Sequence, residues 1–460
     1  MQDAVSKLKE ALGDRVVTDE AALKRYSRDF WPLLMMRDEL GKEIQMPLAL
    51  VMPGSVDDIK AVLRIARESG STVVVRGGGS SVTGASAGGG SIVMDISNLN
   101  RVLDINEYDL TITVESGARL SDVERRLNEL GYSLRHIPQS FNYATIGGLI
   151  ATLSSGQYST LYGNVEDAVI NMEVVLPNGE VTWLRRNNAP RSSTGPPLKF
   201  LFTGSEGMLG VVTKAVLRIV PLPPFEKHGS FKFGSFDDGV KALRDLMVKG
   251  IIPAVARLYD DRDSMIRFNE DRPLLIISFE GHYEDLVGDL WGRARSVIEE
   301  HGGEYAGAGH FEEWLRTRFN VEDDMEKARR FGLWFDTIEV AATWSRLARL
   351  HEDMENSLMG IDGVAAVMAH ASHLYLNGAC IYFTVLFKPD EAIYGKVWDA
   401  AMSVAARDGA TISHHHGIGM LRSRSMGEEL GGAISIIKSI KDALDPWGIL
   451  NSRRGMFFPD

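Results

Sequence analysis

The first half of the chain alternates between helical and strand-like spacing of its hydrophobic residues. Residues 57–69 carry apolar side chains three and four positions apart, which predicts a helix with Ser55 or Asp57 as its N-cap. The β-branched run 73–75 then predicts a buried strand. A further strand is predicted at 91–96, so a glycine-rich loop joins two strands with no helix between them.

The flanking segments add further elements to this pattern. Residues 1–45 predict an N-terminal helical segment, and 98–114 has the spacing of strands. Residues 121–130 predict a short amphipathic helix. The stretch 166–184 predicts two strands joined by a turn at 177–179.

Beyond a proline-rich linker at residues 221–224, strand-like and helical runs take turns. This arrangement predicts an α+β region in which helices cover a sheet. The tail 425–444 has helical spacing and ends before Pro446. The strand-like runs are 229–233, 254–258, 274–279, 337–342, 364–370 and 379–387, and the helical runs are 237–249, 284–301, 345–359 and 393–408.

Composition narrows the class of protein. With 460 residues, 44% of them hydrophobic and 24% charged, the chain has the make-up of a globular protein of two or three domains. The net charge of −12 argues against a general nucleic-acid or anionic-membrane surface, so an anionic ligand has to be held by local positive charge. We expect no transmembrane segment and no signal peptide, because no apolar run of either kind is present. The single cysteine, Cys380, excludes an intrachain disulfide and suits a reducing compartment.

Three consecutive glycines, Gly77 to Gly79, follow the predicted strand at 73–75, and Ser80 and Ser81 come next. Glycines accept positive φ and have no Cβ, so the N–H groups of such a run converge readily on one anion. A Rossmann fingerprint needs a helix directly after its glycines, whereas a second glycine cluster here leads into another strand. We interpret the segment as a pyrophosphate cradle, with a flexible surface loop as the alternative.

Two further stretches are rich in small residues. Residues 136–165 contain no Asp, Glu, Lys or Arg, and small side chains there let the backbone approach a large flat ligand closely. A tightly packed, glycine-rich core is the alternative interpretation. A third glycine-rich element, 204–210, precedes the strand-like run 211–219.

In this order the three elements resemble the FAD-binding domain of the vanillyl-alcohol oxidase (PCMH-type) flavoprotein family. The motifs are RGGGSSVTG at 76–84, ATIGGLIAT at 144–152 and GSEGMLGVVT at 204–213. The resemblance implies non-covalent FAD, with the first motif on the pyrophosphate and the other two along the isoalloxazine and ribityl chain. The residues that it assigns to FAD are Arg76, Gly77, Gly78, Gly79, Ser80, Ser81, Gln139, Ser140, Thr145, Gly147, Gly148, Thr152, Ser154, Ser155, Glu206, Gly207, Gly210, Val211 and Val212.

The same resemblance implies an α+β fold: a PCMH-type FAD-binding domain of two α/β subdomains, with an α+β cap domain built on an antiparallel sheet. The N-terminal helical segment is expected at 1–45, the FAD-binding domain at 46–224 and the substrate-binding cap at 225–420. A C-terminal helical segment, 421–460, is expected to return to the FAD domain. We further expect a cytoplasmic homodimer, either free or peripherally associated with a membrane, that binds no nucleic acid.

Within that family, the C-terminal half is most similar to the alkylglycerone-phosphate (alkyldihydroxyacetone-phosphate) synthases. The matching pieces are PRSSTGP at 190–196, ARLYD at 256–260, GACIYF at 378–383 and SHHHGIG at 413–419. The resemblance implies that the histidine triplet, one tyrosine and one arginine are catalytic, and that a second arginine and a further histidine bind substrate. The catalytic residues are Tyr382, His414, His415, His416 and Arg257, and the substrate-binding residues are Arg318 and His136.

The residues alone leave alternatives open. On an extended strand the triplet would point to alternate faces, so we expect at most two imidazoles at one site. A metal site through His414 and His416, or a structural role, is the alternative for the triplet. Tyr382 also suits a core position, and arginines are most often surface residues. His370 and His373 belong either to the pocket or to its wall.

The chain departs from the metal-dependent D-lactate and D-2-hydroxyglutarate dehydrogenases, which share the FAD domain. Their pattern is a histidine pair around GDGN followed by Glu-His-Gly. Here the corresponding pieces read HASHLYLNGACIY and HHHGIG, so the metal glutamate is replaced by histidine and GDGN is missing. The comparison predicts that the site holds no metal.

Two functional classes stay open. The first, implied by the resemblance, acts at the flavin N5 on a phosphate- or carboxylate-bearing substrate and exchanges an acyl for an alkyl group on a ketone phosphate, as in ether lipid biosynthesis. It needs an apolar channel, for which residues 333–335, Ile338 and Val340 are candidates, although they suit a core equally well. The second is an FAD-linked oxidoreductase that passes electrons from a 2-hydroxy acid, such as D-lactate or glycolate, or from an alcohol to an acceptor.

Overall fold

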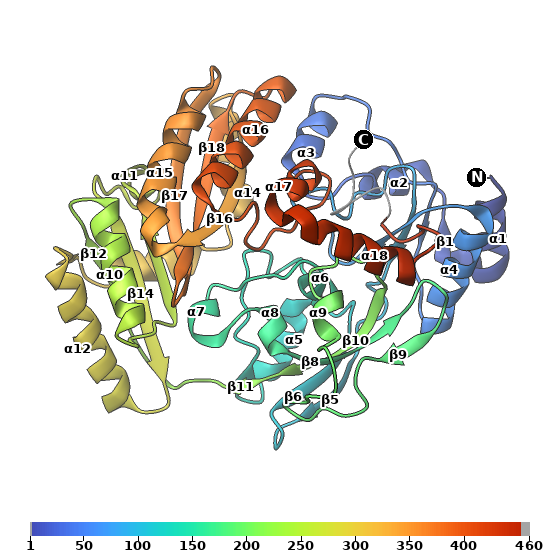
Figure 1. Ribbon diagram of the computed structural model, residues 1–460, viewed down its shortest axis with the longest axis horizontal. Coiled ribbons are helices and arrows are strands. Elements are labelled where there is room, and N and C mark those ends of the chain that lie inside the picture. Colours follow the sequence, from blue (N-terminus) through green and yellow to red (C-terminus); the bar gives the residue numbers. More distant parts are fainter. Residues whose placement is uncertain (1, 452–460) are drawn as a thin grey trace.

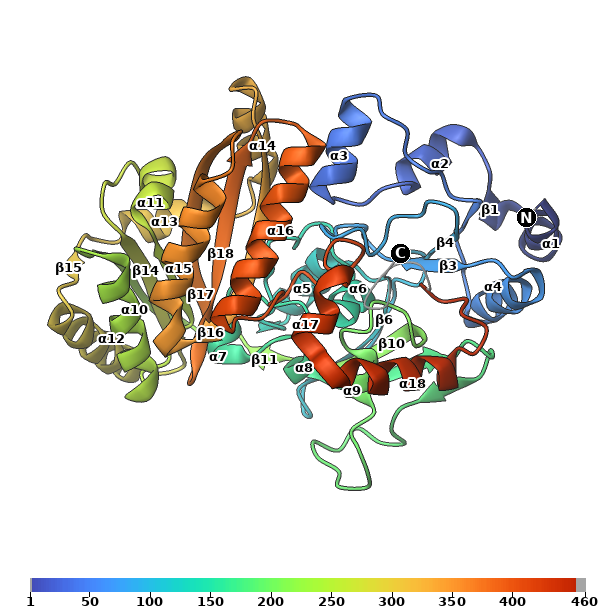
Figure 2. The same cartoon turned by 45° about the horizontal axis from the view of Figure 1, so that its top comes forward.

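The computed structural model describes residues 2–451, and the side chains of all of these except residues 2, 321 and 322. The N-terminal segment is helical, as its pattern predicts. Its elements are α1 (Gln2–Leu12), η1 (Gly13–Arg15), α2 (Glu20–Tyr26) and α3 (Pro32–Glu39). Figure 2 shows α3 beside α16 (Glu391–Asp408), and Arg37 of α3 forms an ion pair with Glu391 at 2.7 Å. The segment therefore connects two distant parts of the chain.

A four-stranded sheet carries the first glycine-rich loop. Its order is β1 (Val16–Val17), β2 (Ala49–Val51), β4 (Ile92–Asp95) and β3 (Val73–Arg76), and β3 runs parallel to β4. Helix α4 (Val56–Ser69) packs its apolar stripe on this sheet. Ser55 caps α4 by accepting a hydrogen bond from the backbone N–H of Asp58. The helix, both strands and the loop between them are therefore confirmed close to their predicted bounds.

An antiparallel five-stranded sheet follows, in the order β5, β6, β10, β8 and β9. Short helices cover it and share its apolar core. The strands are β5 (Val102–Asn106), β6 (Thr111–Glu115), β8 (Val169–Val175), β9 (Val181–Trp183) and β10 (Val211–Arg218), with a separate pair β7 (Tyr132–Ser133) and β11 (Val220–Pro221). The helices are α5 (Leu120–Asn128), α6 (Ile146–Ala151), α7 (Ser159–Tyr162), α8 (Val165–Ala168) and α9 (Lys199–Phe202).

The second half of the chain forms an antiparallel seven-stranded sheet in the order β15-β12-β14-β13-β17-β18-β16. This sheet confirms the predicted α+β fold with an antiparallel cap sheet. The strands are β12 (Phe225–Lys232), β13 (Val255–Tyr259), β14 (Leu274–Gly281), β15 (Glu304–Tyr305), β16 (Trp334–Thr343), β17 (Val364–Tyr375) and β18 (Gly378–Phe387). The predicted division of the chain near residue 224 stays a prediction.

Long amphipathic helices cover one face of the seven-stranded sheet (Figure 1). They are α10 (Phe236–Val248), α12 (Glu284–Glu300) and α15 (Trp344–Met359), with α16 packed against α15. The other face meets α7, and the shorter helices α11 (Asp261–Phe268), α13 (Gly309–Thr317) and α14 (Val321–Arg330) lie around the sheet. Successive side chains of a strand point to opposite faces, so each strand supplies one row to the apolar core and one row to the other face.

Two expectations about the cap and the tail need correction. Ile338, Val340 and Trp334 belong to the buried core beneath α15, so these three channel candidates are core residues. The C-terminal helix is broken into α17 (Met426–Leu430) and α18 (Ile434–Leu444) because glycines occupy 431–432. The last nine residues of the predicted C-terminal segment, 452–460, lie outside the described residues. Within the described residues, no helix is long and apolar enough to cross a membrane.

Candidate active site

The first glycine-rich loop lies directly against the backbone of residues 143–145. A Cβ built on Gly78 would lie 1.8 Å from the Tyr143 carbonyl oxygen, and one on Gly77 would lie 2.1 Å from Thr145 Oγ1. Gly79 has a φ of +67°, which L side chains rarely adopt. Close approach thus requires glycine at positions 77 and 78, and backbone conformation requires it at position 79.

The backbone N–H groups of this loop are available to a ligand. Within the described residues, the N–H groups of Gly78, Gly79, Ser80 and Ser81 make no hydrogen bond to the protein. Gly78 is exposed, whereas Gly79 beside it is buried. Unpaired donors in a loop without room for side chains fit the pyrophosphate of FAD.

Arg76 supports this loop from below. Its Nη1 donates to the carbonyl oxygens of Arg28 and Ser86 at 2.8 and 3.1 Å, and its guanidinium stacks on Tyr26. Burial lowers the pKa of Arg76, while the nearby carboxylates of Asp29 and Asp95 oppose that shift. The arginine therefore fixes the loop and places positive charge beneath it.

The second and third motifs lie on the same side of the molecule as the loop. Thr145 is the N-cap of α6 and accepts a hydrogen bond from Gly148 N–H at 3.3 Å. Several other residues predicted to contact FAD have side chains engaged elsewhere. The Thr152 hydroxyl donates a hydrogen bond to Gly148 O, the Ser155 hydroxyl donates to Asn164, and the Ser154 hydroxyl is bonded to His136. The Gln139 amide donates to Arg318 O, and the Glu206 carboxylate accepts from the backbone N–H groups of residues 418 and 419. The side chain of Val211 packs in the core.

Strand register assembles the cap side of the site. Glu339 of β16 lies opposite Tyr382 of β18, which lies opposite His370 of β17, which lies opposite Tyr259 of β13. Directly opposed residues share a face of the sheet, so these four form one row across four strands. This row lies on the face that the long helices leave free, and it places the predicted Tyr382 at its centre.

The histidine triplet lies in a loop after α16, so its prediction as an extended strand is wrong. The three rings are neighbours: their centroids lie 5.1 Å apart for His414 and His415 and 4.6 Å for His415 and His416. Tyr382 stacks on His415 at 6.0 Å and meets His416 edge-on at 5.5 Å. A curled loop removes the alternation of a strand, so the three imidazoles form one cluster, with His415 and His416 beside Tyr382 and His414 beside Tyr375.

This segment, residues 413–419, is called the histidine loop below. The buried carboxylate of Glu339 accepts hydrogen bonds from the backbone N–H groups of His414, His415 and His416 at 3.1, 3.2 and 2.9 Å. Glu206 accepts from Ile418 N–H at 2.6 Å and from Gly419 N–H at 3.0 Å. Burial alone would raise the pKa of Glu339, but Arg422 and His416 hold it well below its usual value.

His370 has a defined tautomer. Arg257 Nη2 lies 2.6 Å from its Nε2, and Asp263 Oδ2 lies 3.2 Å from its Nδ1. A guanidinium only donates, so Nε2 accepts and Nδ1 carries the proton toward Asp263. Burial, with Arg257 nearby, lowers the pKa of His370 to about 3, so the ring is neutral. His370 stacks on Tyr382 at 5.1 Å and thus belongs to the site.

His414 is tied to Tyr375 and to a strained histidine. Its Nε2 lies 2.7 Å from Tyr375 Oη, and burial lowers the pKa of His414 to about 4. His373 has a φ of +52° in a β-bulge of β17, and its ring lies 5.1 Å from those of His414 and His415. Its Nδ1 lies 2.7 Å from Ser159 Oγ, which connects the cluster to α7. Burial also lowers the pKa of His373 well below its usual value, so His373 and His414 are neutral rings held by hydrogen bonds.

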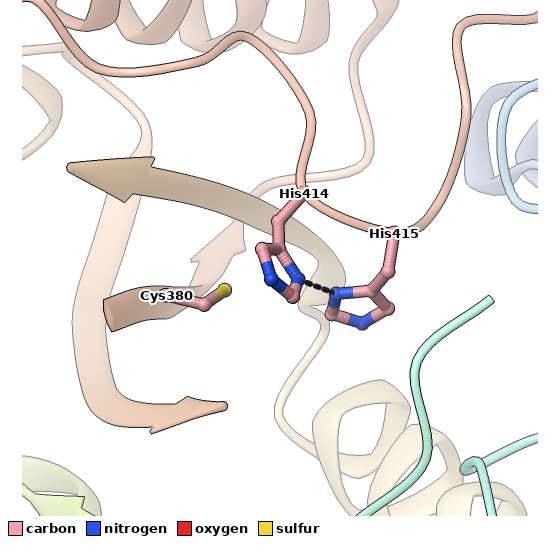
Figure 3. A group of neighbouring side chains, drawn as sticks. All are labelled: Cys380, His414 and His415. Atoms are coloured by element: carbon pink, nitrogen blue, oxygen red, sulfur yellow. Dashed lines mark hydrogen bonds between the residues drawn. The ribbon is translucent and has the colours of Figure 1, made fainter. Parts of the chain in front are cut away.

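Cys380 completes this corner of the site, as Figure 3 shows. Its thiol points toward His414, and the ligating atoms of Cys380, His414 and His415 all lie within 4.8 Å of one another. Burial raises the pKa of the Cys380 thiol well above its usual value, and the Nδ1 atoms of the two histidines face each other at 2.9 Å. A cation there would have to displace that contact and a thiol proton.

Two arginines lie close to the same tryptophan, next to this cluster. The guanidinium of Arg257 lies 5.9 Å from the Trp314 ring and that of Arg318 lies 5.3 Å from it. Arg318 Nη1 donates to Gln157 Oε1 at 3.0 Å, and its buried Nε has no hydrogen-bond partner in the structure. Among the described side chains neither arginine is ion-paired with a carboxylate. The pair forms a local positive site in an otherwise acidic protein, suited to an anion.

His136 is buried on the FAD-binding side. Its Nε2 lies 3.2 Å from Ser154 Oγ, its Nδ1 has no partner in the structure, and burial lowers its pKa to about 4. It lines a small, mainly apolar cavity together with Leu120 and Leu149. Among the described residues His136 forms no hydrogen bond to the row on the cap sheet, although it lies near enough to His373 to help lower the pKa of that ring. Its predicted contact with substrate stays a prediction.

Sequence reasoning missed four residues that hold the site: Glu339, Arg422, Tyr375 and Asp263. The sequence contains one indication of this group: Glu339 interrupts the apolar run of β16, and a charged residue inside a buried strand needs a partner of opposite charge. That partner is Arg422, which is fully buried and forms an ion pair with Glu339. Arg422 lies 83 positions away along the chain, and no local pattern links the two residues.

Comparison with known proteins places this arrangement in a family. Residues 47–185 match the FAD binding domain model, and residues 222–454 match the model of the C-terminal domain of FAD linked oxidases. The chain is 32% identical over 482 residues to the Escherichia coli (strain K12) protein named "Uncharacterized FAD-linked oxidoreductase YgcU", covering 99% of this chain and 98% of that protein.

A second relative and one solved structure point to the same fold. An alkyldihydroxyacetonephosphate synthase of Dictyostelium discoideum is 26% identical over 461 residues, covering 91% of this chain and 75% of that protein. A solved structure of an alkyldihydroxyacetonephosphate synthase superposes with a TM-score of 0.81 at 24% identity, over 98% of this chain and 85% of that one. The likeness confirms the fold that the three glycine-rich motifs predict.

Proposed function

The chain belongs to the FAD-linked oxidase family and is an FAD-dependent enzyme, and we propose that it carries out synthase-like chemistry on a phosphate- or carboxylate-bearing substrate. The observation that supports this most is that Tyr382 of the row stacks on both His370 and His415, near two arginines that have no carboxylate partner among the described side chains. The motifs that carry these residues, at 256–260, 378–383 and 413–419, resemble those of the synthases.

Arg257 and Arg318 are proposed to bind the substrate anion. Both guanidinium groups lie within 6 Å of the Trp314 ring, at 5.9 and 5.3 Å, and the buried Nε of Arg318 is a donor without a partner in the structure. A charge-assisted bond to a phosphate or carboxylate satisfies that donor and holds the substrate in one orientation. The Trp314 ring next to both arginines supplies an apolar wall.

Tyr382 and His415 are proposed to move the proton. Burial raises the pKa of Tyr382, which keeps its hydroxyl protonated at neutral pH. Burial, with neighbouring histidines, lowers the pKa of His415 well below its usual value, which keeps that imidazole neutral. A protonated phenol beside a neutral imidazole forms a donor and acceptor pair that can give a proton to the substrate and take one from it.

FAD, when bound, would supply an electrophilic and redox-active ring to the reaction. The loop of Gly77 to Ser81 and the segment around Thr145 are the residues that would hold its pyrophosphate. We propose non-covalent binding, because the loop carries only glycine and serine and the one cysteine, Cys380, is buried within β18. Acid precipitation is then expected to release the yellow colour into the supernatant, and a yellow pellet would contradict it.

Redox balance tests the reaction class. With an acylated ketone phosphate and a long-chain alcohol, a synthase releases fatty acid without lasting bleaching of the flavin and without oxygen uptake. The assay follows fatty acid, flavin absorbance and oxygen in one anaerobic-to-aerobic series. Release of fatty acid with an unchanged flavin spectrum supports the proposal, and stable bleaching without release contradicts it.

A second candidate is an FAD-linked oxidoreductase of 2-hydroxy acids or alcohols. The relative at 32% identity, which carries the name of an FAD-linked oxidoreductase, favours this candidate. It requires stable bleaching by a substrate such as D-lactate or glycolate, reversed by an added electron acceptor. The same titration therefore separates the two classes.

Three finer expectations belong to the synthase proposal. A product that enters ether lipids gives the enzyme a lipid partner and explains peripheral association with a membrane. The cytoplasm is the proposed location, because the chain carries one buried cysteine and no disulfide. A homodimer is the proposed assembly, and sedimentation of the FAD-loaded protein tests it.

A further inference from the structure

We infer that Glu339 and Glu206 are positioning residues that hold the histidine loop from two sides and thereby set the orientation of its three imidazoles. The inference rests on the proposed function in one respect, namely that these imidazoles act on the substrate. It assigns a role to two carboxylates that lie in different halves of the chain, one in β16 and one in the third glycine-rich element.

Glu339 defines the curl of the loop. One of its oxygens, Oε1, accepts hydrogen bonds from three consecutive backbone N–H groups, those of His414, His415 and His416, and from Ser413 Oγ at 2.7 Å. Successive N–H groups point to one centre only when the backbone curls around an anion. The loop therefore takes this shape because a carboxylate stands at its centre.

Arg422 balances the buried charge of Glu339 and adds hydrogen bonds of its own to the histidine loop. Both side chains are fully buried and form an ion pair. Arg422 Nη1 also donates to Gly417 O at 2.7 Å and to Ser413 Oγ at 3.2 Å, so the pair reaches both ends of the histidine run. A buried ion pair of this kind is expensive to desolvate, and it specifies one conformation of the loop.

Glu206 holds the other half of the loop. Its carboxylate accepts from Ile418 and Gly419, and a Cβ on Gly417 would lie 2.3 Å from its Oε1. Gly417 has a φ of +83°, so both space and backbone conformation require glycine there. The Glu206 side chain thus faces the histidine loop, although its motif was assigned to FAD.

The first glycine-rich loop is the third neighbour of this segment. The carbonyl oxygen of Thr83 accepts from Met420 N–H at 2.9 Å and from Leu421 N–H at 3.2 Å. The backbone after the histidines is therefore bonded to the FAD-binding side, while the histidines themselves are bonded to the cap sheet. Together the two carboxylates fix the imidazoles relative to both the cofactor elements and the substrate strand.

Glu339 also orients one ring directly. Its Oε2 lies 3.1 Å from His416 Nδ1. At this distance the carboxylate attracts positive charge on the ring, although the two atoms are not aligned for a hydrogen bond. His414 has a different orienting partner, Tyr375. The rings are therefore set one by one as well as through the backbone.

Variants of Glu206 test the inference while the buried Arg422 keeps its ion-pair partner Glu339. Glu206→Gln keeps an oxygen that accepts from residues 418 and 419, so it is expected to keep wild-type kcat at pH 7. Glu206→Ala removes the acceptor, and displacement of the loop by about 1 Å is expected to lower kcat about 10²-fold. KM and FAD content are expected to stay near wild type, because the arginine pair and the glycine loop are intact.

Glu124 offers a matched control. It is also a buried carboxylate, and it accepts from Leu134 N–H at 2.8 Å and Ser133 Oγ at 2.9 Å, away from the histidine loop. Glu124→Ala is expected to lower stability as Glu206→Ala does but to keep kcat. Equal losses of kcat in the two alanine variants would overturn the specific role of Glu206.

The Glu339 variant is made together with its partner, so that no unpaired charge stays in the core. Glu339→Gln with Arg422→Gln is expected to bind FAD normally and to lose at least as much kcat as Glu206→Ala. Wild-type kcat in both this double variant and Glu206→Ala would overturn the inference. If the double variant fails to fold, the difference in kcat between Glu206→Gln and Glu206→Ala is the test of the inference.

Histidine variants separate this inference from the proposed function. If His415→Ala and His416→Ala keep wild-type turnover, the proposed catalytic role of the loop fails whatever the carboxylate variants do. If those histidine variants are inactive while Glu206→Ala and the Glu339/Arg422 double variant are fully active, only the positioning role fails. Loss of kcat in all of them, with rescue in Glu206→Gln, supports both.

Discussion

Two glycine-containing loops of this protein use the same backbone chemistry with opposite outcomes. In the loop at 77–81, the N–H groups of residues 78–81 donate no hydrogen bond to any described residue. The histidine loop at 413–419 has its N–H groups bonded to two buried carboxylates, Glu339 and Glu206. One loop is open to an anion from outside the chain, and the other is closed on anions from inside it.

The difference teaches what each loop requires of its surroundings. The open loop is packed closely against residues 143–145, so a side chain at Gly77 or Gly78 would overlap those residues. A closed loop needs buried charge, so Arg422 and His416 must hold the pKa of Glu339 low against the cost of burial. Steric substitutions are therefore expected to break the first loop, and loss of a buried hydrogen-bond acceptor the second.

The largest effect is expected from Gly78→Val. A branched side chain would overlap the Tyr143 carbonyl and push the loop away from the pyrophosphate position. The variant is expected to purify without FAD, as read from the ratio of flavin to protein absorbance. Gly234→Val is the matched control, since a Cβ at Gly234 meets nothing within 4 Å. Stoichiometric FAD in the Gly78 variant would place the pyrophosphate elsewhere.

Tyr382→Phe is expected to cost about 10²–10⁴ in kcat, the usual contribution of a positioned proton donor. The ring stacks on His370 and His415, and phenylalanine preserves that stacking. FAD content and KM should therefore stay the same. Turnover close to wild type would show that the hydroxyl moves no proton.

The arginine pair is expected to act on KM. Arg318→Ala or Arg257→Ala should raise KM by the equivalent of about 2–4 kcal/mol, because a desolvated charge-assisted bond is lost. Arg316→Ala is the control from the same segment, since the Arg316 side chain is 75% exposed. If neither inner variant changes KM more than the control does, the anion binds elsewhere.

The smallest effect is expected from Glu206→Gln, on the pH dependence of stability. Burial raises the pKa of Glu206 to about 7 from its ordinary value of 4.5, although two backbone N–H groups and Arg422 oppose that shift. Between these values the folded chain holds a proton that the unfolded chain has released. The free energy of unfolding should therefore fall as pH rises through this window, by about 3 kcal/mol from this group.

The glutamine variant has no such proton and should lose less stability from pH 4.5 to pH 7 than wild type does. Urea unfolding at several pH values measures the slope. Glu124→Gln tests whether any buried glutamate has the same effect, since burial raises the pKa of Glu124 as well. Parallel slopes for wild type and Glu206→Gln would show that Glu206 titrates as an exposed group.

The sequence predicts the open loop well and the closed loop poorly, for a physical reason. The strands at 73–76 and 92–95 and the glycines between them are contiguous, so local spacing and backbone freedom determine the loop. The histidine loop depends on Glu339, Glu206 and Arg422, which cross-strand register and tertiary packing bring to it. A triplet of histidines gives no local sign of its curl, and its prediction as a strand fails for that reason.

The cap shows the same division between local and distant information. Alternation along β16 and β18 predicts strands, and the structure has them at Trp334–Thr343 and Gly378–Phe387. The pairing of Tyr382 with His370 and Glu339 depends on register across β16, β18 and β17, which no single segment contains. The resemblance named Tyr382, but only the fold shows which residues orient it.

Hydrogen exchange in the apoprotein and the FAD-loaded protein tests the central contrast most directly. Peptides that cover 76–84 and 412–420 report the backbone N–H groups of the two loops. We predict that 412–420 is protected in both states, because its acceptors belong to the chain, and that 76–84 exchanges fast without FAD and slowly with it. Protection of 76–84 in the apoprotein, or fast exchange of 412–420 in both states, would contradict the account.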